Sequence, residues 1–237
     1  MKKYTFIAND IRKKILEGVY QANQQIPFEK KLCAEYGVSK MTVKKGLDIL
    51  VAEGLIIKRR GSGTFVKDLS ASELERLAVA NQFRGTTALH PDQKVKSKVL
   101  VFSVINADAL IKNKLNMQED QFVYNISRVR LVEGNPLVME RMFMPIDLIP
   151  GLKKERIEGS LYEYIEEDLG LKIQSGHRSI SVRQATKEEQ SYLGLTSGDP
   201  VAVAEQIAYL DTGQAFEYSI SVHRYDNFSV EFVLTRS

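Results

Sequence analysis

Apolar residues recur at helical spacing at the start of the chain. Ile7, Ile11 and Ile15 lie four positions apart and are separated mainly by charged and polar residues. This spacing places the three side chains on one face of a helix, which Gly18 is expected to end. The first predicted element is therefore a helix with one buried face.

Two further helices are predicted next. Pro27 suits the start of a short helix with Leu32 facing inward, and Gly37 suits its end. Ser39 is a good N-cap for a third, longer helix that ends at Gly54. The inward positions of the third helix are Val43, Leu47 and Leu50.

Two short apolar runs follow the third helix. Residues 55–58 and 64–66 flank a turn with the sequence Arg-Arg-Gly-Ser-Gly, which predicts a β-hairpin with a glycine-rich tip. Three helices followed by such a hairpin are typical of a winged helix-turn-helix. In that motif the helix after the turn enters the major groove of DNA.

The remainder of the chain alternates between strand-length and helical patterns. Residues 69–95 are more polar and are predicted to be a linker with a short helix from Ser70 or Ser72. Helices are also predicted from Asn106 to residue 115 and after capping-box patterns at Ser160 and Thr186. The predicted strands cover residues 96–105, 123–132, 137–144, 201–209 and 215–223.

The charge is distributed unevenly along the 237 residues. Residues 1–68 hold 14 Lys and Arg against 7 Asp and Glu, a formal charge of +7, whereas residues 69–237 hold 19 against 23, a charge of −4. A basic first third is typical of a module that binds a polyanion and is joined to a domain with another task. The composition, 43% hydrophobic and 27% charged, favours a soluble globular protein.

Few residues are available for covalent or metal chemistry. Cys33 is the only cysteine, which excludes an internal disulfide and favours a reducing compartment, and we expect it to be a small core residue. His90, His177 and His223 lack metal-ligand spacing. We predict no catalytic residue, metal, cofactor or membrane span. The N-terminal residues lack the apolar run of a signal peptide, so we expect a cytoplasmic location.

The third predicted helix presents cations to the outside. With its apolar stripe inward, Met41, Lys44 and Lys45 point roughly 100–200° away, and Lys40 lies nearer the boundary. A solvated helix face is the ordinary explanation of such a lysine pair. It does not explain the cations of the adjoining elements, which are Lys30, Lys31, Arg59 and Arg60. The cluster favours a DNA-binding surface.

A set of regularly spaced residues runs through this segment. Its members are Tyr4, Ile7, Gly18, Pro27, Glu29, Leu32, Val38, Ser39, Thr42, Val43, Leu47, Glu53, Gly54 and the run Gly-Ser-Gly-Thr-Phe-Val at 61–66. In this order and spacing they resemble the DNA-binding domain of the GntR family of bacterial transcription regulators.

The resemblance implies which residues contact DNA. Lys30, Lys40 and Lys44 stand where the family has arginines, and lysine cannot form the bidentate fork that arginine makes with guanine. The other residues placed at the DNA are Ser39, Met41, Thr42, Lys45, Arg60, Gly61 and Gly63. Phe28 replaces a serine that usually caps the second helix. Gly46 replaces an alanine, at a cost of about 0.5–1 kcal/mol in helix stability.

Charged residues alternate with apolar ones in several later strands. Arg128 and Arg130 share a face, Glu140 lies on an otherwise apolar face, and Glu217 alternates with Ser219, Ser221 and His223. Ser160 and Tyr162 begin a predicted helix. Arginines, a helix start and carboxylates suit a phosphorylated polyol. Simpler explanations stay open: Ser160 as an N-cap, the arginines as a solvated face, and Glu140 as an ion pair, for instance with Arg128.

A second resemblance covers residues 96–232. The matching stretches are Arg128-Val-Arg130, Gly134-Asn-Pro136, Glu140, Ser160-Leu-Tyr162, Glu217-Tyr-Ser219 and His223-Arg-Tyr-Asp226. They resemble a UTRA domain, the ligand-sensing domain of the HutC subfamily within the GntR family. Its fold is similar to chorismate lyase, an antiparallel sheet with packed helices.

The UTRA resemblance implies an effector site. Residues matching Arg128, Arg130, Ser160 and Tyr162 hold a phosphate, and those matching Glu140 and Glu217 bind the rest of the effector. His223 stands near a position that often bears tyrosine, and Phe83 and Arg84 are candidates from the linker.

The sequence therefore predicts an α+β protein with a winged helix-turn-helix domain at 1–68, a linker at 69–95 and a UTRA effector-binding and dimerisation domain at 96–237. We expect a homodimeric repressor of a carbohydrate operon that binds a palindromic double-stranded DNA operator. A small effector, a sugar phosphate, is expected to release it by changing the spacing of the DNA-binding domains through the linker.

Two alternatives to a regulator have less support in the sequence. A lyase-like enzyme could use Glu140 and Glu217 as acid and base, but no nucleophile elbow, metal set or cofactor fingerprint supports it. A nonspecific architectural DNA binder would leave the acidic C-terminal domain unexplained.

Overall fold

The chain folds into two compact units, each with its own hydrophobic core. The computed structural model describes residues 2–70, 73, 85–87, 89–90, 92–118, 121–230 and 233–234. One unit comprises Met1–Gln82 with Val230–Ser237, and the other comprises Phe83–Ser229.

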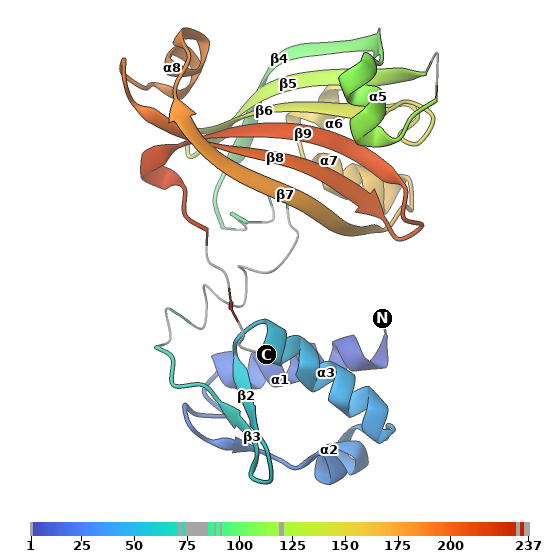
Figure 1. Ribbon diagram of the computed structural model, residues 1–237, viewed down its shortest axis with the longest axis vertical. Coiled ribbons are helices and arrows are strands. Elements are labelled where there is room, and N and C mark those ends of the chain that lie inside the picture. The colour runs from blue at the N-terminus through green and yellow to red at the C-terminus, as the bar shows by residue number, and fades with distance from the viewer. Residues whose placement is uncertain are drawn as a thin grey trace. The chain divides into compact units, whose positions relative to one another are not determined.

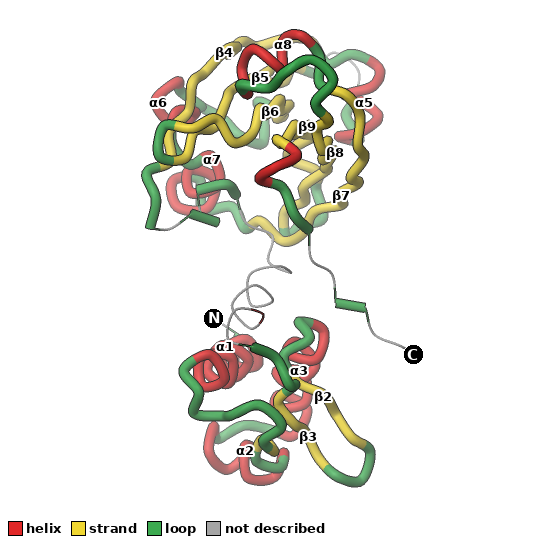
Figure 2. Tube along the Cα trace, turned by 90° about the vertical axis from the view of Figure 1, so that its left-hand side faces the viewer, coloured by secondary structure: helices red, strands yellow, loops and turns green. Residues whose placement is uncertain are grey.

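The first unit has three helices and a small antiparallel sheet. The helices are α1 (Lys3–Leu16), α2 (Glu29–Tyr36) and α3 (Lys40–Ala52), and the strands are β1 (Gln25–Ile26), β2 (Ile56–Arg59) and β3 (Gly63–Val66). The sheet order is β1-β3-β2, and the β2–β3 hairpin stands out from the helices of this unit (Figure 2). The predicted winged helix-turn-helix is confirmed; β1 was not predicted.

Helix ends in this unit follow the predicted capping residues. The Ser39 side chain accepts a hydrogen bond from the Thr42 backbone N–H at the start of α3, and Gly37 ends α2 in the left-handed conformation. Phe28 occupies the N-cap of α2 and makes no side-chain capping bond. The side chain at this N-cap position therefore leaves the first N–H groups of α2 uncapped.

Gly46 lies where α1 and α3 approach each other closely. A Cβ atom built on Gly46 would lie 3.0 Å from the Tyr4 carbonyl oxygen and 3.2 Å from Ile7 Cγ2. The propensity cost of a glycine inside α3 is therefore matched by the close packing that it permits.

The second unit is built on one antiparallel sheet of six strands in the order β4-β5-β6-β9-β8-β7 (Figure 1). The strands are β4 (Val95–Asn106), β5 (Phe122–Val132), β6 (Asn135–Pro145), β7 (Ile173–Gln184), β8 (Pro200–Leu210) and β9 (Ala215–Arg224). All five predicted strands are present. The edge strand β7 was not predicted.

Short helices cover both faces of this sheet. They are α5 (Ala109–Leu115), α6 (Lys154–Glu158), α7 (Leu161–Glu163) with the π-helical turn Tyr164–Asp168, α8 (Lys187–Leu193) and the 3₁₀ turn Tyr225–Asn227. Buried residues of α6, α7 and the π-helical turn pack with Ile126 and Met142. Those of α5 pack with Phe143 and those of α8 with Val129, on the opposite face.

One predicted cap was wrong. Asn106 remains in β4, paired with Phe122, and the side chain of Asp108 caps α5 by accepting from the Ile111 backbone N–H at 2.8 Å. Thr186 forms the full predicted capping box with Glu189. Ser160 accepts from the Glu163 N–H, so its predicted capping role is also present.

The predicted linker is described only in part. Ser70 and Glu73 exchange hydrogen bonds in the capping-box pattern, with Ser70 N–H donating to Glu73 Oε2 at 2.8 Å and Glu73 N–H donating to Ser70 Oγ at 3.3 Å. Ser72, Phe83 and Arg84 lie outside the described residues. Across the described ranges, no helix has the length and apolar character needed to cross a membrane.

A larger side chain at position 46 should separate α1 from α3. We expect Gly46→Leu to lower the free energy of unfolding of the first unit by about 1–3 kcal/mol, the usual cost of overpacking. Lys45→Leu, on the exposed face of the same helix, should change it by less than about 0.5 kcal/mol. Urea unfolding followed by far-UV circular dichroism compares the two, and equal effects would contradict the packing argument.

Candidate functional site

The outer face of α3 is exposed as predicted. Met41 is 62% exposed, and Lys40, Lys44 and Lys45 are exposed, whereas Val43 is buried. Among the other predicted DNA contacts, Thr42 and Gly63 are half-buried and the exposed ones are Lys30, Ser39, Arg60 and Gly61. Every predicted DNA-contacting side chain is therefore on the surface of the first unit.

The wing brings further cations to this surface. Gly61 and Gly63 have φ values of 77° and 118°, which glycine adopts without strain. The Arg59 guanidinium lies 4.6 Å from the ring centre of Phe65, a cation–π contact that braces the hairpin. The tip residues 60–62 are left exposed.

A hollow lies between α2, the start of α3 and the wing. Its lining includes Lys30, Lys40 and Arg59, which belong to the predicted cations, and Gly61 of the wing. Phe28 also lines it and is 62% exposed. The sequence identified Phe28 only as a replacement for a capping serine and did not indicate that its ring lies at this surface.

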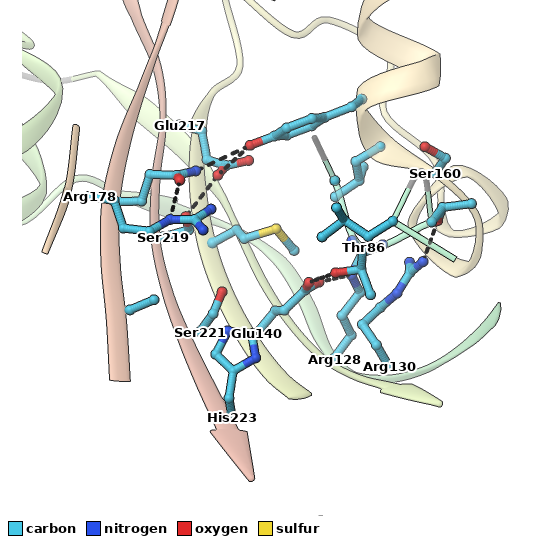
Figure 3. Close-up of a pocket in the computed structure, with 18 residues that line it drawn as sticks. Thr86, Arg128, Arg130, Glu140, Ser160, Arg178, Glu217, Ser219, Ser221 and His223 are labelled. Atoms are coloured by element: carbon cyan, nitrogen blue, oxygen red, sulfur yellow. Dashed lines mark hydrogen bonds and ion pairs between the residues drawn. The ribbon is translucent and has the colours of Figure 1, made fainter. Parts of the chain in front are cut away.

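The second unit holds a cavity of about 100 Å³ over one face of its sheet (Figure 3). All seven predicted effector residues line it, namely Arg128, Arg130, Glu140, Ser160, Tyr162, Glu217 and His223. The strand register explains this convergence, because Arg128 is opposite Glu140 and Glu140 is opposite Ser221. Residues directly opposite on paired strands present their side chains on the same face.

Arg128 is fixed by a buried ion pair. Its Nε donates to Glu140 Oε2 at 2.7 Å, and its Nη1 donates to the carbonyl oxygens of Ile157 at 2.6 Å and Gly159 at 3.2 Å. The suggestion that Glu140 pairs with Arg128 is confirmed. Burial raises the pKa of Glu140, but the charges of Arg128 and Arg130 outweigh this and hold it below its usual value.

Arg130 differs from Arg128 in having no ion pair among the described residues. It is 1% exposed and donates to Ser97 Oγ at 2.9 Å, to the Gly159 carbonyl at 2.7 Å and to Thr87 Oγ1 at 2.5 Å. Its Nε has no partner within those same residues. Burial, with the neighbouring Arg128 charge, lowers the pKa of Arg130 to about 10, so it stays cationic at neutral pH.

Glu217 is a second buried carboxyl group, 2% exposed. Ser219 Oγ donates to its Oε1 at 2.8 Å and Tyr162 OH donates at 3.2 Å, while Oε2 has no partner in the described part of the chain. Burial raises the pKa of Glu217, and the Glu140 charge adds to this. Glu217 therefore keeps one oxygen available to a molecule in the cavity.

His223 lines the cavity as a neutral group. Burial lowers its pKa to about 4, the charge of Arg178 contributes in the same direction, and Glu140 opposes it. Its ring lies 4.4 Å from that of Phe228. A neutral imidazole both donates and accepts hydrogen bonds.

Several lining residues were missed from the sequence. Arg178 lies on the unpredicted strand β7, and its Nε donates to Gln206 Oε1 at 2.8 Å. Thr86 and Thr87 come from the predicted linker, and Thr86 Oγ1 donates to Glu140 Oε1 at 2.9 Å. The strand signal of β7 is weak because most of its positions are exposed and polar.

Comparison with known families agrees with both units. Residues 3–66 match the bacterial regulatory proteins of the gntR family, and residues 91–229 match the UTRA domain. The chain belongs to the GntR family of regulators with a UTRA domain. It is therefore a DNA-binding transcriptional regulator with an effector-binding domain, and the lyase-like enzyme is not favoured.

Individual relatives support this assignment. The chain is 40% identical over 236 residues to the HTH-type transcriptional regulator GmuR of Bacillus subtilis, covering 100% of both chains. The crystal structure of the possible transcriptional regulator YydK from the same species has a TM-score of 0.75 at 32% identity, again covering 100% of both chains. The effector-binding domain of the B. subtilis trehalose repressor TreR covers 60% of this chain and 99% of its own, with a TM-score of 0.53 and 29% identity.

The depressed pKa of His223 predicts a specific acid sensitivity. Because the folded pKa of about 4 lies below the unfolded value near 6.5, the neutral histidine contributes stability above pH 6.5 that is lost as the pH falls towards 4. The loss should reach up to about 3 kcal/mol. We expect His223→Gln to lose less free energy of unfolding than the wild type over this window.

The raised pKa of Glu217 acts in the opposite direction between these pH values, but it is common to both proteins, so their difference isolates His223. Urea titrations at pH 7, 5.5 and 4.5 measure it. If the free energies of unfolding of the wild type and His223→Gln differ by the same amount at all three pH values, the assignment of the acid sensitivity to His223 is wrong.

Proposed function

We propose that this regulator is a cytoplasmic, homodimeric repressor of a carbohydrate-uptake or catabolism operon, and that a phosphorylated sugar releases it from a palindromic operator. The proposed domains are residues 1–68 for DNA binding, 69–95 as the linker and 96–237 for effector binding and dimerisation. The gntR match at 3–66 and the UTRA match at 91–229 support these boundaries.

The observation that carries the effector proposal is the uncompensated charge of Arg130. A buried cation is costly unless it is paired, and Glu140, the carboxylate opposite Arg128, is hydrogen-bonded to Arg128 and not to Arg130. Arg130 Nε points to no partner among the residues described. A phosphate group would supply the missing negative charge and accept from arginine in the geometry that arginine favours.

The rest of the cavity suits a hydroxylated molecule. Glu217 has an available carboxyl oxygen, and Ser160, Ser221 and the neutral His223 add further hydrogen-bonding groups. These groups can satisfy several sugar hydroxyls at once. The similarity to the effector-binding domain of a trehalose repressor supports a carbohydrate as the effector and repression as the mode of control.

The predicted linker contacts the effector residues directly, which suggests how the signal passes. Thr87 accepts from Arg130 and Thr86 donates to Glu140. An effector phosphate that takes the donors of Arg130 competes with Thr87 for them. Effector binding would thereby rearrange the segment that leads to the DNA-binding domain and change the spacing of the two domains in the dimer.

The proposal is tested by a thermal-shift screen of sugar phosphates, followed by gel shifts with any compound that binds. The operator is obtained by selection from a random duplex pool. We expect a sugar phosphate to raise the melting temperature and to release the operator. Linkage requires the operator to weaken effector binding by the same factor, and calorimetry showing equal effector affinity with and without operator would refute this mechanism.

Lys44 should be essential for operator recognition. We expect Lys44→Ala to abolish specific binding at moderate salt while leaving the circular dichroism spectrum unchanged, because its side chain is exposed. For the DNA binding that remains, the slope of log affinity against log salt concentration should be smaller in magnitude by about one than for the wild type. Lys13→Ala, which removes an exposed lysine of α1, is the matched control. An unchanged gel-shift affinity for Lys44→Ala would reject the assigned role.

Thr87 should oppose effector binding. Thr87→Val keeps the side-chain shape but removes the oxygen that accepts from Arg130, so we expect several-fold tighter binding of the sugar phosphate found in the screen. In Thr87→Val, the effector should also lower the affinity for the operator by a smaller factor than it does in the wild type. Thr212→Val, in the β8–β9 turn, is the control. Calorimetry that finds equal or weaker effector binding by Thr87→Val would exclude the competition.

A further inference from the structure

Arg178 lies at the far end of the cavity from the paired arginines. Arg128 is on β5 and Arg178 is on β7, and the sheet order places four strand intervals between them. The two ends are visible in Figure 3, where Arg178 lies near Glu217 and Ser219 and away from Arg130.

A row of polar groups connects Arg178 to the interior of the cavity. Gln206 is directly opposite Arg178 on β8, accepts from its Nε and donates to Tyr162 OH at 3.4 Å. Tyr162 in turn donates to Glu217. Gln206 is buried, so this row fixes the position of an otherwise exposed arginine at the rim.

The bonding of Arg178 leaves most of its donors available. Arginine has five N–H donors, and the contact with Gln206 uses the one on Nε. Within the described residues, its Nη1 and Nη2 have no hydrogen-bond or ion-pair partner. This contrasts with Arg183 on the same strand, whose two Nη atoms are both bound to Glu189 at 2.7 and 2.6 Å.

We propose that Arg178 is a specificity-determining residue, which donates to oxygen atoms of the effector at the end remote from its phosphate. The inference rests on the proposed function, in which Arg130 binds that phosphate. A phosphate ester as short as glycerol phosphate carries its hydroxyl groups close to its phosphate. A phosphorylated hexose or disaccharide carries hydroxyl and ring oxygens farther from the phosphate, and Arg178 selects this class over shorter polyol phosphates.

Calorimetry with three probes tests the assignment. Glucose 6-phosphate, trehalose 6-phosphate and glycerol 3-phosphate are titrated into the full-length wild type, Arg178→Gln and the control Arg183→Gln. Loss of a charge-assisted hydrogen bond should lower the affinity of Arg178→Gln for the tighter-binding of the two sugar phosphates about tenfold. Its affinity for glycerol 3-phosphate should stay within twofold, and Arg183→Gln should match the wild type for all three probes.

The outcomes separate this inference from the proposed function. An equal loss for the sugar phosphates and glycerol 3-phosphate would assign Arg178 a general electrostatic effect and overturn its role in specificity. Unchanged sugar phosphate binding by Arg178→Gln would overturn it as well. A wild-type protein that binds none of the three probes would overturn the inference for this class of effector, whereas the proposed function itself stands or falls with the wider screen of sugar phosphates.

Discussion

The arrangement of the effector-binding unit depends on two neighbouring buried arginines, of which only Arg128 is paired with a carboxylate among the described residues. Arg128 and Arg130 lie on the same face of β5, and Glu140 opposes Arg128 directly on β6. The carboxylate of Glu140 neutralises the charge of Arg128. The backbone carbonyls of residues 157 and 159 accept hydrogen bonds from Arg128, and that of residue 159 also accepts from Arg130. In an ordinary hydrophobic core, apolar residues could replace this arrangement without loss of stability, because buried ion pairs contribute little net stability. In the proposed function, a ligand in the cavity completes the charge balance of this arrangement.

Because Arg130 lacks an ion pair within the described residues, neutral oxygen atoms provide its present partners, and one of these belongs to Thr87. The contact joins the sheet to the segment that follows the DNA-binding domain. The hydrogen bond from Thr86 to Glu140 joins the same segment to the other half of the charge cluster. In the proposed mechanism, a ligand that changes the charge balance therefore acts on this segment directly, without a longer chain of coupled residues.

Much of this architecture could be predicted from the sequence, because strong local signals coincide with the fold. Helix caps such as Ser39 and Thr186, the glycine-rich wing and the alternation around Glu140 each follow from short-range chemistry. The predictions that failed concern features that depend on contacts between distant parts of the chain. Edge strand β7 is mostly polar and exposed, so neither its presence nor the position of Arg178 could be inferred from periodicity. Asn106 was a plausible cap, but the pairing of β4 with β5 extends through it.

Tertiary packing also changes the interpretation of single residues in the DNA-binding unit. Gly46 is unfavourable in an isolated helix, yet α1 approaches so closely that a larger residue would have to push it aside. The helix that carries Met41 and the lysines is therefore positioned by backbone contact with α1. In the proposed complex with DNA, these lysines act mainly as point charges towards phosphate, and Ser39, Met41 and Thr42 are the proposed contributors to base selectivity. The exposed ring of Phe28, among the cations that line the same hollow, places one more apolar surface beside them.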